Sequence, residues 1–194
     1  MGSEQIKEKV GRRTRLAPAM WILAALSCWF HPGPILAQNF QTRQGIGSED
    51  ATLSDNEVHI VKYALPLMLI ALKFSEVAQT KCSDPRTIQL AKEIGADFST
   101  IREELEAAAR AHGLSYREGL EQSQEKEVLQ LSQVPKGAIF DKKYCEKTSS
   151  TLVEMEMGLE GPIYAEDLKR VVERSKQAAG AYEHQAQVLI TEIH

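Results

Sequence analysis

The sequence lacks the features that mark the common catalytic sites. It has no glycine-rich phosphate-binding loop, no Gly-x-Ser-x-Gly motif and no His-Glu-x-x-His motif. None of its five histidines has a glutamate three residues before it, which excludes the paired Glu-x-x-His ligands of a di-iron helical bundle. Single histidines without a second ligand close in the sequence rarely hold a metal. We therefore predict no catalytic residue, no metal site and no cofactor, and we expect that the protein is not an enzyme.

Aromatic residues and net positive charge are also scarce. Aromatics make up 6% of the 194 residues, and the net charge is −4. The low aromatic content favours aliphatic helix packing over a β-sandwich, and the negative charge makes an electrostatic nucleic-acid binder a poor fit. Hydrophobic residues reach 43%, which is enough for a real core.

The N-terminal segment has the pattern of an export signal. Five basic residues precede the apolar run of residues 16–30, which is shorter than the roughly 20 residues that span a bilayer. Helix breakers and a small-residue site ending at Ala37 follow. We predict a signal peptide over residues 1–37, a mature chain that begins at Gln38, and a location in the periplasm or cell envelope, with no stable transmembrane span after signal removal. Lipidation at Cys28 and the choice between Sec and Tat export stay open.

The mature chain would keep two of the three cysteines, Cys82 and Cys145. An even pair in an oxidising compartment is read first as a disulfide. A nucleophilic Cys145 would need a base and a lowered pKa, and although Lys142, Lys143 and Lys147 are near, no partner is identifiable. The alternative is a pair of small core residues. We predict a Cys82–Cys145 disulfide.

The rest of the chain is predicted to be helical. Residues 38–53 are polar and are expected to be a disordered lead-in. Helical periodicity then marks four stretches, at about residues 54–80, 85–112, 138–159 and 162–193, with a short helix near 125–133 in the connector. The fold class predicted for residues 54–193 is an all-α, up-down four-helix bundle with one long crossover connection.

The first of these helices is apolar on its outer face as well as its inner face. The uncharged middle of the outer face consists of Leu65, Pro66, Leu69 and Ile70. Because a bundle buries only the inner face of a helix, something should cover these residues. The connector, a second copy of the chain and another envelope protein are the three alternatives. Pro66 predicts a kink or break.

The segment "VLQLSQVPKGAIFDKKY" resembles the domain-of-unknown-function 4142 family of exported proteins with a ferritin-like helical bundle. The matching positions are Leu131, Ser132, Gly137, Phe140, Asp141 and Tyr144. "DPRTIQLAKEIGADFSTIREEL" and "YEHQAQ" are similar to the second and last helices of the family, and the similarity covers about residues 55–190. Where the family usually has two further histidines, this chain has Phe98 and Leu152, which we expect to fill the interior.

Two functions remain after this comparison. The first is a non-catalytic binding or structural bundle of the cell envelope, with a possible homo-oligomer or envelope partner at the first helix. The alternative is a metal-dependent or stress-protective ferritin-like protein that would use a polar cluster of Asp97, Asp141, Thr148 and His184.

Overall fold

The computed structural model describes residues 52–193. These residues form five α-helices and no strand: α1 (Asp55–Lys81), α2 (Pro85–Ala111), α3 (Gln122–Gln133), α4 (Ala138–Gly158) and α5 (Glu166–Glu192). The all-α prediction is confirmed. The predicted signal peptide and almost all of the predicted lead-in lie outside the described residues.

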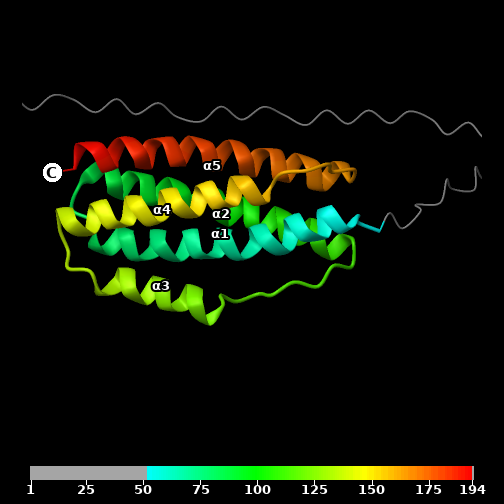
Figure 1. The fold of residues 1–194 in the computed structure, drawn as a ribbon, viewed down its shortest axis with the longest axis horizontal. Helices are drawn as coiled ribbons and strands as arrows, with labels where there is room; N and C mark the ends of the chain where they lie inside the picture. Colours follow the sequence, from blue (N-terminus) through cyan, green and yellow to red (C-terminus); the bar gives the residue numbers. More distant parts are fainter. Residues whose placement is uncertain (1–51, 194) are drawn as a thin grey trace, which may run out of the picture. The chain divides into compact units, whose positions relative to one another are not determined.

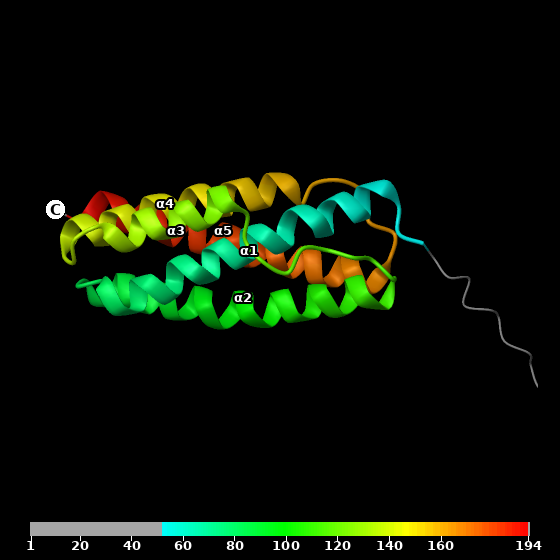
Figure 2. The ribbon, with the colours of Figure 1, turned by 90° about the horizontal axis from the view of Figure 1, so that it is seen from below.

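The four long helices pack side by side, and α3 lies outside them. α1 and α5 each pack against both α2 and α4, so the four helices form a closed ring. Helices that are neighbours in this ring run in opposite directions (Figures 1 and 2). Because α2 and α4 run in the same direction, the connector between them returns along the whole length of the array and carries α3 against α1 and α4.

The inward faces of α2, α4 and α5 follow the periodicity of the sequence. Phe98 in α2 and Leu152 in α4 are fully buried, as predicted. The predicted apolar stripe of α5 is buried in full: Leu168, Val171, Val172, Ser175, Ala179, Tyr182, Ala186 and Leu189. The apolar stripes therefore identify the core from the sequence alone.

α1 is the most apolar of the five helices. It packs against α2, α4 and α3. Among the described residues, it is the helix long and apolar enough to cross a membrane, but 56% of its apolar window is buried inside the protein. The break predicted at Pro66 does not occur, and the helix continues through it. A proline removes the hydrogen bond to the carbonyl four residues earlier, and that carbonyl belongs to Lys62, an exposed residue that water can reach.

The start of α5 differs from the prediction. The sequence places it at Pro162, but the helix begins at Glu166. Residues 162–165 are not helical, and the backbone N–H groups of Tyr164 and Ala165 donate to Oε1 of Glu57 at 2.7 and 2.8 Å. These two donors hold the end of the loop against α1.

Glu57 is a buried carboxylate that joins two helix starts. Its other oxygen, Oε2, accepts from the backbone N–H of Ser54 at 2.8 Å and from the Ser54 hydroxyl at 2.7 Å, which completes a capping box on α1. Burial alone would raise the pKa of Glu57, but the hydrogen bonds from Ala165, Ser54 and Tyr164 outweigh it and lower the pKa to about 2. The ionised form is therefore the one that the folded protein stabilises.

We predict that Glu57 makes the protein sensitive to acid. Its pKa is lower in the folded state than the ordinary 4.5, so its contribution to stability is complete above about pH 4.5 and is lost as the pH falls toward 2. The contribution is up to about 3 kcal/mol. Glu57→Gln should lower the free energy of unfolding at neutral pH by about 1–3 kcal/mol and flatten its decline between pH 5 and 2. Denaturant unfolding at several pH values measures both effects.

The matched control is Asp55→Asn, an exposed carboxylate two residues earlier in the same helix turn. It should leave the acid-induced loss of stability largely unchanged. An acid profile that is the same for wild type and Glu57→Gln would contradict the prediction.

Candidate functional site

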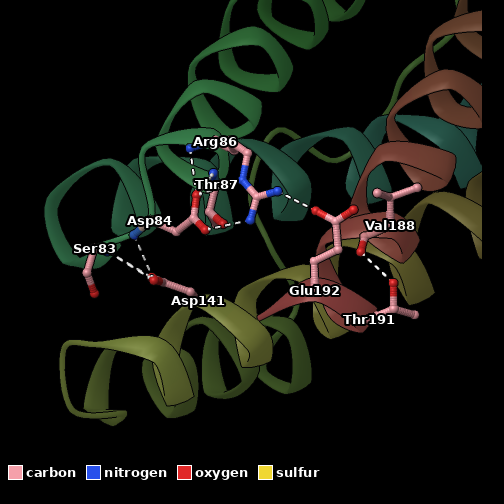
Figure 3. A network of polar contacts seen from close by, with 8 residues as sticks. All are labelled: Ser83, Asp84, Arg86, Thr87, Asp141, Val188, Thr191 and Glu192. Carbon is pink, nitrogen blue, oxygen red and sulfur yellow. Dashed lines mark hydrogen bonds and ion pairs between the residues drawn. The ribbon is translucent and has the colours of Figure 1, made fainter. Parts of the chain in front are cut away.

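Figure 3 shows a network of polar contacts at the end of the helix array where α2 and α4 begin and α5 ends. At its centre is Asp141, in the first turn of α4 and 2% exposed. The backbone N–H of Ser83 donates to its Oδ1 at 2.9 Å, and the N–H of Asp84 donates to its Oδ2 at 2.9 Å. Asp141 thus ties the α1–α2 loop to the start of α4, as Glu57 ties the α4–α5 loop to α1.

Asp84 extends this network to α5. It caps α2 by accepting the N–H of Arg86 at 2.7 Å, and it pairs with the Arg86 guanidinium at 3.0 Å. The bond from that guanidinium is the main cause that lowers the pKa of Asp84. Arg86 also pairs with Glu192 in the last turn of α5. This end therefore links α4, the α1–α2 loop, α2 and α5 through four charged side chains.

The predicted Cys82–Cys145 disulfide is absent, because both cysteines are free and buried thiols. Each sulfur has its own oxygen neighbour: the Asp141 carboxylate lies beside Cys82 and the Thr87 hydroxyl lies beside Cys145. Burial is the largest cause that raises the pKa of both thiols, to about 12 for Cys145. Such thiols are protonated at neutral pH, so the structure gives neither a bridge nor a nucleophile.

A groove runs between α2 and α5 beside this network, with a volume of about 560 Å³. Leu90, Val188 and Leu189 give it an apolar floor. The polar residues that line it include Arg86, Glu93, His184 and Glu192. No serine, threonine, cysteine or lysine is among the residues lining the groove, so it offers binding surface without a hydroxyl, thiol or amine nucleophile.

The polar cluster of the alternative function is not assembled. Asp97 accepts a 2.6 Å hydrogen bond from the hydroxyl of Tyr182, which is the second-largest cause, after burial, that raises the pKa of that tyrosine. Asp141 is bonded to the α1–α2 loop, Thr148 is buried in α4, and His184 is exposed on α5. Within residues 52–193, no three histidine, cysteine, aspartate or glutamate side chains come together as a metal site.

The predicted partner-binding patch of α1 is only partly accessible. Leu65 and Ile70 are buried, whereas Pro66 and Leu69 are partly exposed. Ile70 and Leu67 face a small cleft that residues of α3 and α4 also line. A partner could reach only Pro66 and Leu69, and the prediction that one binds there stays a prediction.

The sequence singled out Asp141 as a family-matching position and as a member of the alternative polar cluster, but its bond to the α1–α2 loop was missed. The available signal was a single acidic residue among apolar ones in the first turn of a helix. Such a buried carboxylate needs hydrogen-bond donors, and backbone N–H groups are the commonest ones. Glu57 was missed entirely, because its place on the mostly apolar α1 gave no clear inward face.

Comparison with known proteins yields a family and a solved structure. The family model described as a domain of unknown function, DUF4142, matches residues 44–188. A crystal structure of a DUF305 fragment from Deinococcus radiodurans is similar with a TM-score of 0.64 and 14% sequence identity, over 72% of this chain and 98% of that one. At that identity the likeness concerns the fold alone. No curated protein matches the chain significantly.

We predict that Asp141→Asn destabilises the protein by about 1–3 kcal/mol. An amide replaces one of the two accepting oxygens with a donor, so the bonds weaken: an amide oxygen in the place of Oδ2 keeps the Asp84 N–H at 2.9 Å but leaves the Ser83 N–H only its longer 3.2 Å bond, without the 2.9 Å bond to Oδ1. Asp97→Asn is the control, because Asp97 is exposed and accepts a single hydroxyl bond. Urea unfolding of the two variants should give a clearly larger loss for Asp141→Asn, and equal losses would refute the role assigned to it.

Proposed function

The chain belongs to the DUF4142 family of domains of unknown function, and we propose that it is a non-catalytic binding or structural module of the cell envelope. We also propose that it is exported, with residues 1–37 as its signal peptide. The segment supporting export lies outside the described residues, and the support is its sequence pattern of basic residues, a short apolar run and a small-residue site.

The observation that carries the proposal is that the two buried carboxylates, both thiols and His112 are buried or engaged in structural contacts. Glu57 and Asp141 hold backbone N–H groups, and both thiols are buried and protonated. His112 pairs with Asp167 at 3.2 Å, which joins the end of α2 to the start of α5. A catalytic group must be accessible to a substrate, and these side chains are buried or held by the protein's own groups.

The helix order supports a finer proposal about the fold. The four long helices alternate in direction around the ring, and one long connection crosses from α2 to α4. This is the order of ferritin-like bundles, which have a single crossover connection. We propose that the domain is a ferritin-like bundle in which Phe98 and Leu152 occupy the interior with apolar side chains.

Native mass spectrometry of protein isolated from the envelope fraction tests this function. The expected species begins at Gln38 and carries no stoichiometric transition metal. A cytosolic species of full length would overturn the export, and about one tightly held iron, zinc or copper ion per chain after chelation would overturn the non-catalytic role in favour of a metal-dependent one. Addition of zinc to the purified protein, followed by desalting, controls for loss of a weakly held metal during isolation.

A further inference from the structure

The start of α4 exposes an apolar side chain among lysines. Ile139 is 76% exposed, although the next residue, Phe140, is fully buried. Lys142 and Lys143 follow at three and four residues, which places them on the same face of the helix as Ile139. Lys136 lies three residues before it, and all three lysines are exposed. We call Ile139 and these three lysines the basic knob.

The α2–α5 groove has complementary properties. Its floor is apolar, and Val188 is 41% exposed within it. Its rim includes two carboxylates, Glu93 and Glu192. Glu192 already pairs with Arg86, whereas Glu93 accepts a hydrogen bond from the neutral side chain of Gln89 and forms no ion pair with another described residue. An apolar side chain that carries a cation beside it would satisfy both the floor and Glu93.

The basic knob and the groove lie at the same end of the protein. α4 begins there, α2 begins there and α5 ends there (Figures 1 and 2). The groove is lined from the first residues of α2 and the last turns of α5, from Pro85 to Glu93 and from His184 to Glu192. A two-fold axis beside this end would therefore let each of two copies offer its knob to the groove of the other, which closes the assembly as a dimer.

We propose that the occupant of the α2–α5 groove is a second copy of this chain, with Ile139 on the groove floor and a lysine of the basic knob paired with Glu93. The charge complementarity of the knob and the groove favours this occupant over an uncharged apolar ligand. Leu129 is also 56% exposed, but it belongs to α3, which packs against α1 and α4, whereas the groove is lined by α2 and α5. The proposed dimer depends neither on export nor on a non-catalytic role. The dimer can therefore fail while the proposed function holds, and the reverse.

Sedimentation velocity of the purified protein over a range of concentration and salt tests the dimer. We expect a monomer–dimer equilibrium that weakens as salt rises, because the pairs at the rim are screened. Ile139→Asp should raise the dissociation constant by at least about tenfold, as loss of a central apolar anchor does. Leu129→Asp is the matched control and should leave the dissociation constant unchanged. Circular dichroism checks that both variants are folded.

A charge exchange makes the test specific to the groove. Glu93→Lys should weaken the dimer, and Glu93→Lys combined with Lys142→Glu or Lys143→Glu should restore it. A wild-type protein that is monomeric at every concentration would overturn the proposal. So would a dimer that Ile139→Asp and Leu129→Asp weaken equally, or open-ended oligomers, which a closed two-fold arrangement does not produce.

Discussion

Two buried carboxylates, one at each end of the helix array, hold the loops on which the arrangement of the helices depends. Asp141 accepts the N–H groups of Ser83 and Asp84 at the end where α2 and α4 begin. Glu57 accepts those of Tyr164 and Ala165 at the end where α1 and α5 begin. In each case a helix side chain fixes a loop that follows a different helix. The apolar faces would bring four helices together without these contacts, but the loops would not be fixed in position.

The hydrogen bonds of the two buried carboxylates also bear on function. An interior carboxylate is costly unless donors surround it, and here the donors are backbone N–H groups and the Ser54 hydroxyl. The side chains available for recognition therefore lie on the surface. The α2–α5 groove combines core residues such as Leu90 and Leu189 with the exposed Val188, and the basic knob at the start of α4 is exposed.

Much of the fold could be predicted from the sequence because three of the long helices carry clean stripes. The stripes of α2, α4 and α5 gave their core residues. α2 ends next to a glycine, Gly113, whose φ is 67°; the bonds from Gly113 N–H to Arg110 and from Leu114 N–H to Ala109 form a left-handed cap. α1 gave less, because a helix covered on three sides has no polar face to orient it. Long-range bonds, such as those of Asp141 and Glu57, leave no periodic signal. The disulfide prediction was wrong because sequence spacing does not say which way each sulfur points.

Native-state hydrogen exchange of four loop amides tests the central role of the two carboxylates most directly. The N–H groups of Ser83, Asp84, Tyr164 and Ala165 should exchange as slowly as helical amides of the core, because they open only when the ends of the array come apart. Connector amides such as that of the exposed Gly119 give the rate of an unheld loop. If the four amides exchange at the rate of Gly119, the carboxylates do not hold the loops and the account is wrong.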